Sequence, residues 1–113
     1  MKRRFRLTRT QDFERVRRLG RSYAHPLVVL IAFPNQIAQT RIGVSAGRAV
    51  GGAVQRNRAK RILRAAVVPL MSSIPPGYDI ALLARRKILG EKSTALQPVI
   101  ASLLKKANIL PKP

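Results

Sequence analysis

The sequence has very few of the residues from which protein active sites are built. It contains no cysteine, one histidine (His25) and only four acidic residues, Asp12, Glu14, Asp79 and Glu91. The absence of cysteine excludes disulfide bonds and thiolate metal sites, and it fits a cytoplasmic protein. A protein-only nuclease needs clustered carboxylates around metal ions, or a pair of histidines for acid–base chemistry. We therefore expect no catalytic residue, no metal site and no cofactor bound by the protein alone.

Long apolar runs are missing as well. The longest run, Leu27 to Phe33, has the length of a strand, whereas a membrane span needs about 20 residues. The basic residues after Met1 are not followed by a signal-like apolar region, so we expect neither secretion nor contact with a membrane. A length of 113 residues, 46% of them apolar, favours one domain, 1–113, with a modest core. Residues 1–7 are expected to form a basic N-terminal arm.

The charge is strongly one-sided. Twenty-three lysines and arginines face four acidic residues, which gives a formal net charge of +19. A compact domain with this charge repels itself unless a polyanion neutralises it. The cations are spread along the whole chain and do not form one basic amphipathic helix, which disfavours a membrane surface as the partner. Composition therefore favours nucleic acid as the partner and indicates no small-molecule substrate.

Periodicity and turn signals predict an alternation of helices and strands. The first helix is expected over 8–19, with Thr8 or Thr10 as its N-cap. Thr8 and Gln11 have the spacing of a capping box, and Gly20 stands just after the helix end. Residues 22–33 are expected to be extended, and residues 40–45 are predicted to form a strand that pairs with them as a hairpin. Within that second strand, Gly43 indicates a bulge or a close approach of another group.

The second half of the chain is predicted to contain two more helices and one more strand. Residues 53–68 form a helix, residues 78–84 form a buried and central strand, and residues 92–107 form the last helix. Pro98 is expected to lie in the first turn of that helix or to break it. The lone His25 precedes a proline and has no ligand partners, so a structural role is favoured. Asp79 stands at the start of a strand, where a capping or turn role is expected.

The segment Gly51–Arg64, GGAVQRNRAKRILR, concentrates positive charge on the predicted helix 53–68. At 100° per residue, one arc of this helix is apolar and the opposite arc is polar and cationic, with no acidic residue to pair with it. Unpaired charge of one sign on a helix face indicates an external partner. The apolar arc contains Ala59, Ile62, Leu63, Ala66, Val67 and Leu70, and the cationic arc contains Asn57, Arg58, Lys60, Arg61 and Arg64, with Arg56 at the border.

The stretch SAGRAVGGAVQRNRAKRILR resembles the signature of the bacterial ribonuclease P protein subunit. The similarity extends to RLTRTQDFERVRRLGRS near the N-terminus and to YDIALLAR at 78–85, and so covers nearly the whole chain. The resemblance implies an α+β fold in the order αβββαβα, with a four-stranded mixed sheet and a left-handed βαβ crossover. It also implies that residues 22–26 begin a short separate strand.

The resemblance further implies a function as the protein component of a ribonucleoprotein endoribonuclease. Its partners would be the ribonuclease P RNA, which carries the chemistry with magnesium ions, and precursor tRNA, whose 5′ leader is removed. The implied leader cleft, between the first helix and the sheet, contains Phe13, Arg17 and Ile31. The implied contacts with the catalytic RNA are Arg48, Arg56, Asn57, Arg58, Lys60, Arg61 and Arg64.

The chain departs from the family pattern in ways that bear on these contacts. Ala49 stands where the family usually has the second of two lysines. Arg17 and Ile31 stand where the family has aromatic residues, which leaves Phe13 for base stacking, with Tyr23 or Phe33 as candidate helpers. We therefore expect a leader cleft that relies more on charge and less on stacking.

Two other functions remain open on composition. One is a ribosomal or chaperone-type basic RNA-binding protein without a nuclease role. The other is a DNA-binding protein that places the helix 53–68 in the major groove, although no partner helix precedes it. The Arg-Asn-Arg motif in its strand–loop–helix context is the feature that separates these alternatives from the ribonuclease P subunit.

Overall fold

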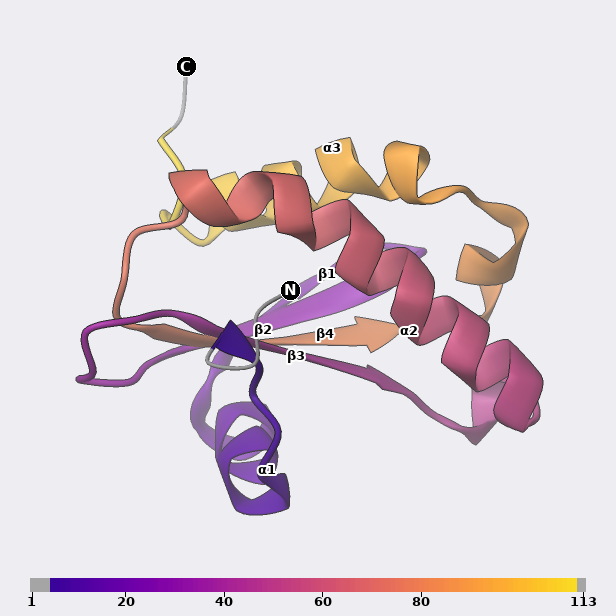
Figure 1. Cartoon of the computed structure of the whole chain (residues 1–113), viewed down its shortest axis with the longest axis horizontal. Coiled ribbons are helices and arrows are strands. Elements are labelled where there is room, and N and C mark those ends of the chain that lie inside the picture. Colours follow the sequence, from indigo (N-terminus) through magenta and orange to yellow (C-terminus); the bar gives the residue numbers. More distant parts are fainter. Residues whose placement is uncertain (1–4, 112–113) are drawn as a thin grey trace.

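The computed structural model, which describes residues 5–111, is a four-stranded sheet with one helix on one face and two on the other (Figure 1). The order αβββαβα is confirmed. The elements are α1 (Thr10–Leu19), β1 (Arg21–Ala24), β2 (Val28–Pro34), β3 (Arg41–Ala46), α2 (Ala53–Val67), β4 (Tyr78–Ala84) and α3 (Ser93–Lys106). Short 3₁₀ helices connect them: η2 (Arg48–Val50), η3 (Val68–Ser73) and η4 (Arg86–Gly90).

The strand order is β1-β2-β4-β3, so β4 is central, as predicted. The expected hairpin between 40–45 and the preceding strand is wrong, because β4 lies between β2 and β3. Residues Asp79–Leu82 of β4 are all buried, which suits an interior strand. β4 is antiparallel to β2 and parallel to β3.

Helix α2 connects the parallel strands β3 and β4. In Figure 1 both strands run from left to right, β3 lies nearer to the viewer, and α2 returns above them. This crossover is left-handed, as the family resemblance implied. It leaves α2 on the same face of the sheet as α3, while α1 lies alone on the other face.

The extended segment 22–33 is divided between β1 and β2, which form an antiparallel hairpin. The separate first strand is therefore confirmed. At the turn, His25 Nδ1 accepts a hydrogen bond from the Leu27 N–H at 3.1 Å, and this bond gives the lone histidine the structural role that was expected.

The core has two parts, one on each face of the sheet. The larger part packs α2 and α3 against the sheet through residues such as Leu30, Leu63, Leu82 and Ile100. The smaller part lies under α1 and contains Leu7, Val16, Ile31 and Ala81. Each fully buried leucine or isoleucine contributes about 1.5–3 kcal/mol. The α1 face therefore depends on few residues for its stability.

The ends of α1 differ from the predicted ones. The residue that caps its N-terminus is Arg9, which makes no side-chain capping bond, so the Thr8–Gln11 capping box is wrong. Gly20 follows the helix but has φ −76°, an ordinary extended value. A Cβ at Gly20 would lie 2.6 Å from the Val16 carbonyl oxygen and 2.7 Å from Ile31 Cγ2. Glycine is required there because the chain turns into β1 in contact with β2.

The last helix contains a proline. Pro98 lies inside α3, so the prediction that it falls in the first turn or breaks the helix is wrong. Pro98 and Thr94 are both exposed, so water can satisfy the Thr94 carbonyl that loses its donor.

Of the predicted N-terminal arm, residues 1–4 lie outside the described residues. The Leu7 N–H donates to the Ile42 carbonyl of β3 at 2.8 Å. Within residues 5–111 no helix is both long and apolar enough to cross a membrane.

Candidate nucleic-acid interface

The loop before α2 sets the direction of that helix. Gly51 has φ 145°, a value that favours glycine, and a Cβ there would lie 2.9 Å from Gln55 Cβ. In η2 the N–H groups of Val50 and Gly51 donate to the carbonyls of Gly47 and Arg48. These two amides are therefore already bonded, and the Arg48 side chain beside them is exposed.

Helix α2 is buried along one side, as its periodicity predicted. Ala59, Leu63, Ala66 and Val67 are buried, whereas Ile62 is only half-buried. On the other side, Asn57, Arg58 and Arg61 are exposed and Arg56, Lys60 and Arg64 are half-buried. We call these six polar residues, together with Arg48, the α2 cationic face.

The positive charges of the α2 cationic face are not neutralised within the protein. The ion pairs found in residues 5–111 all join α1 residues to each other, or join Arg41 of β3 to α1 and β4. No α2 side chain takes part in any of them. A patch of arginine and lysine without internal partners is suited to the phosphates of a nucleic acid.

On the opposite face of the sheet, Phe13 of α1 lies against Gly43 of β3. A Cβ on Gly43 would lie 2.8 Å from both Cδ2 and Cε2 of the Phe13 ring. The expected close approach at Gly43 is therefore confirmed, and the approaching group is Phe13. The ring remains half-buried rather than enclosed, so one side of it is available to a ligand.

A strip of the sheet beside α1 is not covered by the helix. Ala24, Val29, Leu83 and Ser45 are in register across the four strands, and each is half-buried or exposed. Next to this strip, a hollow of about 250 Å³ is lined by residues that include Phe13 and Ser45. We call the strip, this hollow and Phe13 the α1 groove.

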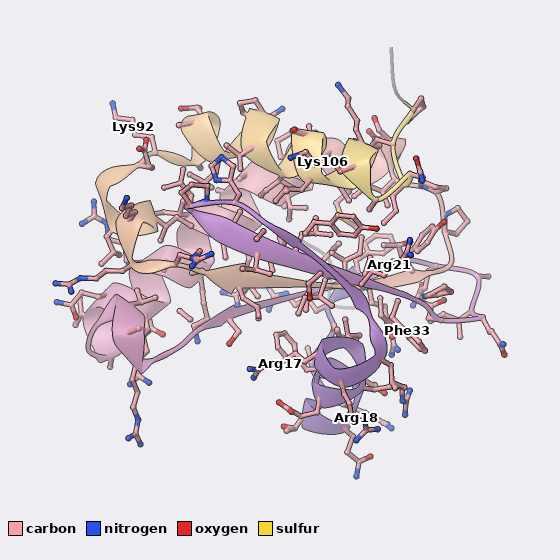
Figure 2. The ribbon with its side chains drawn as sticks, turned by 180° about the vertical axis from the view of Figure 1, so that it is seen from behind. Arg17, Arg18, Arg21, Phe33, Lys92 and Lys106 are labelled. Carbon is pink, nitrogen blue, oxygen red and sulfur yellow. The ribbon has the colours of Figure 1, made fainter. Side chains whose placement is uncertain are left out.

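The other predicted leader-cleft residues lie in different places. Figure 2 shows Arg17 on the left of α1, below the sheet, Arg18 at the bottom of that helix and Phe33 on its right. Arg17 is half-exposed and is 3.5 Å from Glu14. Ile31 is only 5% exposed and packs in the core under α1, so its assignment to an open cleft is wrong.

The two aromatic residues that were expected to help Phe13 do not line the hollow beside it. Tyr23 packs against the larger core, on the α2 and α3 side of the sheet. Tyr23 and Phe33 both line a separate hollow at the β1 edge. Phe13 is thus the only one of these three aromatic residues to line the α1 groove.

The α1 groove ends at a cluster of cations that was not assigned from the sequence. A hollow of about 480 Å³ begins at Ala24 and is lined by Ala24, His25, Pro26, Arg85, Arg86 and Lys87. The signal was present as a basic run directly after the strand 78–84. The turn between β1 and β2 that completes the hollow lies about sixty residues earlier, and only the fold brings the two together.

A buried ion pair fixes α1 relative to the sheet. Arg41 Nη2 donates to Asp79 Oδ2 at 2.7 Å and its Nε donates to Asp79 Oδ1 at 2.9 Å. The same guanidinium reaches Asp12 of α1 at 3.4 Å. The hydrogen bonds to Asp79 raise the pKa of Arg41 above its ordinary value. Asp79 is 2% exposed, so its expected role at a turn is corrected to that of a buried partner.

The carboxylates and the histidine do not assemble a metal site. No group of three or more potential ligands from histidine, cysteine, aspartate and glutamate occurs in residues 5–111. The α2 cationic face presents guanidinium and ammonium groups, and the α1 groove presents the ring of Phe13.

The known proteins with similar sequences belong to one family. The protein-family model described as Ribonuclease P matches residues 1–108. The ribonuclease P protein component of Dehalococcoides mccartyi strain 195 is 41% identical over 112 residues, covering 99% of this chain and 92% of that protein. The corresponding protein of Chloroflexus aurantiacus is 40% identical over 114 residues, covering 100% of this chain and 84% of that protein.

Solved structures show the same fold. The RNase P protein of Staphylococcus aureus superposes with a TM-score of 0.81 at 29% identity, covering 95% of this chain and 98% of that one. The RNase P protein of Thermotoga maritima superposes with a TM-score of 0.77 at 27% identity, covering 89% of this chain and 96% of that one.

Proposed function

Since this chain belongs to the ribonuclease P protein family, we propose that its two opposite faces divide the RNA contacts of that ribonucleoprotein. The α2 cationic face binds the catalytic RNA. The α1 groove binds the 5′ leader of precursor tRNA. The observation that carries the proposal is the presence of two distinct surfaces, one polar and mainly cationic and one that joins an aromatic ring to a cationic hollow.

Family membership makes the chain the protein component of an endoribonuclease that matures the 5′ end of tRNA. It also decides against a ribosomal or chaperone-type protein and against a DNA-binding protein. The carboxylates among residues 5–111 form no catalytic cluster, so the proposal assigns bond cleavage to the RNA subunit. Magnesium ions act there with the RNA, and the protein supplies positive charge and alignment.

The contact with the catalytic RNA rests on the charge and shape of α2. Arg56, Arg58 and Arg61 present planar guanidinium groups that bind phosphate through two hydrogen bonds and also stack on bases. Arg48 extends the surface beyond the start of the helix. Each phosphate neutralised in this way releases a counterion, which makes the affinity strongly dependent on salt.

The contact with the leader rests on the order of groups along the α1 groove. A base stacks on Phe13 at one end, and phosphates reach Arg17 and the hollow of Arg85, Arg86 and Lys87 at the other. The strip between them offers small and apolar side chains over which a strand of any sequence can pass. Such a groove suits a leader whose sequence varies between precursors, in the cytoplasm where tRNA is processed.

Reconstitution tests the proposal. The protein is added to a bacterial ribonuclease P RNA and a precursor tRNA at low magnesium concentration, and the cleavage rate is measured. We expect strong stimulation by the wild type, and little by the triple variant Arg56→Ala, Arg58→Ala, Arg61→Ala. Stimulation by an unrelated basic protein to the same extent would overturn the assignment. The affinity for precursor tRNA with and without its leader then tests the α1 groove separately.

A further inference from the structure

The open edge of β1 carries a hollow that belongs to neither proposed surface. It has a volume of about 270 Å³ and forms where α1 ends, β1 begins and α3 ends. Its lining is mainly apolar and aromatic, with one cation. The residues that matter here are Leu19, Arg21, Tyr23, Phe33, Tyr78 and Ala107.

The lining of this hollow is unusual for a solvent-facing edge. Leu19 is 55% exposed, although it is a large apolar side chain. Tyr23 and Tyr78 are half-buried, and among residues 5–111 neither hydroxyl has a hydrogen-bond partner. A partly exposed aromatic ring with an unused hydroxyl suits a planar ligand that carries polar groups on its rim, such as a nucleobase.

Cations line both sides of the hollow. Figure 2 shows Lys106, Arg21 and Arg18 following one another from α3, across β1, to α1. None of the three forms an ion pair with another residue of 5–111. Arg18 and Lys106 stand in the last turns of helices, where the helix dipole favours a cation. Arg21 belongs to a strand, so helix stabilisation does not account for it.

We infer that the β1-edge hollow, with Arg18, Arg21 and Lys106, is a further binding surface for single-stranded RNA. One base enters the hollow and lies against Tyr23, and the neighbouring phosphates contact the three cations. Duplex RNA is excluded because its bases are paired and stacked and cannot enter. The proposed function needs only the α2 cationic face and the α1 groove, so this surface goes beyond it.

The β1-edge hollow lies on the opposite side of the molecule from α2 and β3. Figure 1 has the α2 and β3 side of the molecule toward the viewer, and Figure 2, seen from behind, has β1 toward the viewer. RNA on the α2 cationic face therefore leaves the β1 edge accessible. The protein can then hold a second RNA strand, or a distant part of the same RNA, on its far side.

Photocrosslinking provides the first test, with the full chain and a 12-nucleotide single-stranded RNA that contains 4-thiouridine. After tryptic digestion and fragmentation of the crosslinked peptides, a base in the β1-edge hollow marks Tyr23 or Phe33 in the peptide 22–41. A base in the α1 groove marks Phe13 in the peptide 10–15, or Ala24 or Val29 in the peptide 22–41. We expect crosslinks at both sets of residues. Crosslinks confined to Phe13, Ala24 and Val29 would overturn the inference and leave the proposed function intact.

Variants at the two ends of α3 provide the second test, because they remove the same charge from the same helix. Lys106→Ala lies beside the hollow, whereas Lys92→Ala lies at the far end of α3 (Figure 2). We expect Lys106→Ala to weaken binding of the oligonucleotide about threefold or more and Lys92→Ala to weaken it less. Tyr23→Leu should weaken binding about fivefold or more.

The outcomes separate the alternatives. Equal affinities for Lys106→Ala and Lys92→Ala would overturn the inference. So would a lower melting temperature for Lys106→Ala without any loss of affinity, because that result assigns Lys106 to helix stability. Competition by a glutamate decapeptide as strong as that by unlabelled RNA would show a general anion surface, and would overturn it too. Stimulation of cleavage, measured separately, reports on the proposed function.

Discussion

The Phe13 ring lies on the backbone of Gly43, so a residue of β3 that has no side chain determines where the aromatic surface of α1 stands. The distance of 2.8 Å from a Gly43 Cβ to two ring carbons leaves no room for even a methyl group. The ring position is thus set by the pair. Either residue, changed alone, alters the α1 groove.

Gly43→Ala should displace Phe13 and destabilise the fold by about 1–3 kcal/mol, because the methyl group overpacks a filled site. Urea unfolding measures the loss. The double variant Gly43→Ala, Phe13→Leu should lose less than the sum of the two single variants, since the smaller side chain relieves the clash. Strict additivity would show that the ring does not contact Gly43.

The leader contact should depend on charge more than on stacking. Arg17→Ala should reduce the salt slope of leader binding by about 0.7, the value for one phosphate of a single strand. Glu14→Gln removes the anionic neighbour of Arg17 and should strengthen leader binding. The measurement is the affinity for precursor tRNA, relative to tRNA without a leader, at several salt concentrations. A flat salt response together with a large loss for Phe13→Ala would contradict this prediction.

On the opposite face, Arg58→Ala and Arg61→Ala should each weaken binding to the catalytic RNA and lower its salt slope by about 0.7–0.9. Both side chains are exposed, so unfolding free energies should change by less than about 0.5 kcal/mol. Lys92→Ala is the matched control for the loss of one charge. If a variant loses stability and affinity together, its side chain stabilises the fold and the prediction is wrong.

Substitutions on the buried side of α2 should reduce the stability of the fold, in contrast to those of the exposed arginines. Leu63→Ala removes a fully buried side chain and should destabilise the protein by about 2–5 kcal/mol. Ile62→Ala should cost clearly less because Ile62 is only half-buried. Denaturant unfolding of the two variants checks the order. Equal losses would mean that Ile62 packs as deeply as Leu63.

Arg41→Leu should destabilise the fold by about 2–4 kcal/mol, because it leaves the buried Asp79 carboxylate with fewer partners. The folded-state pKa of Arg41 lies above the unfolded one, so its contribution is present below the unfolded value and is lost only in strong alkali. The loss caused by Arg41→Leu should therefore be the same at pH 7 and pH 9. Adding Asp79→Leu should restore part of the stability, whereas a further loss would argue against the pair.

Local patterns in the sequence predicted the helices well. The α2 stripe of Ala59, Leu63, Ala66 and Val67 follows from residue spacing alone, because a helix is built from contacts within four residues. Gly43 was recognised as a site of a bulge or a close approach from its position alone, because a glycine inside a strand often marks one of these two features. The identity of the approaching group was not predictable, because Phe13 lies thirty residues away and on another element.

Pairing between distant strands was the part that the sequence left undetermined. β3 follows β2 in the chain, and a short connection between strands normally indicates a hairpin. The more apolar β4 displaces β3 from that position, and only the completed sheet shows this. Ile31 was placed in the leader cleft by the family resemblance, but it is buried and pairs with Ala81 of β4. The hollow of His25 and Arg85 likewise depends on a long-range contact.

The central place of β4 has a consequence for how the protein is made. On the ribosome, α1 and the first three strands emerge well before residues 78–84, yet β2 and β3 have no direct pairing to hold them together. The α1 groove and the α2 crossover both require β4 between those strands. We therefore expect the two proposed RNA-binding surfaces to be completed together, in a late and non-local folding step that is slow relative to helix formation.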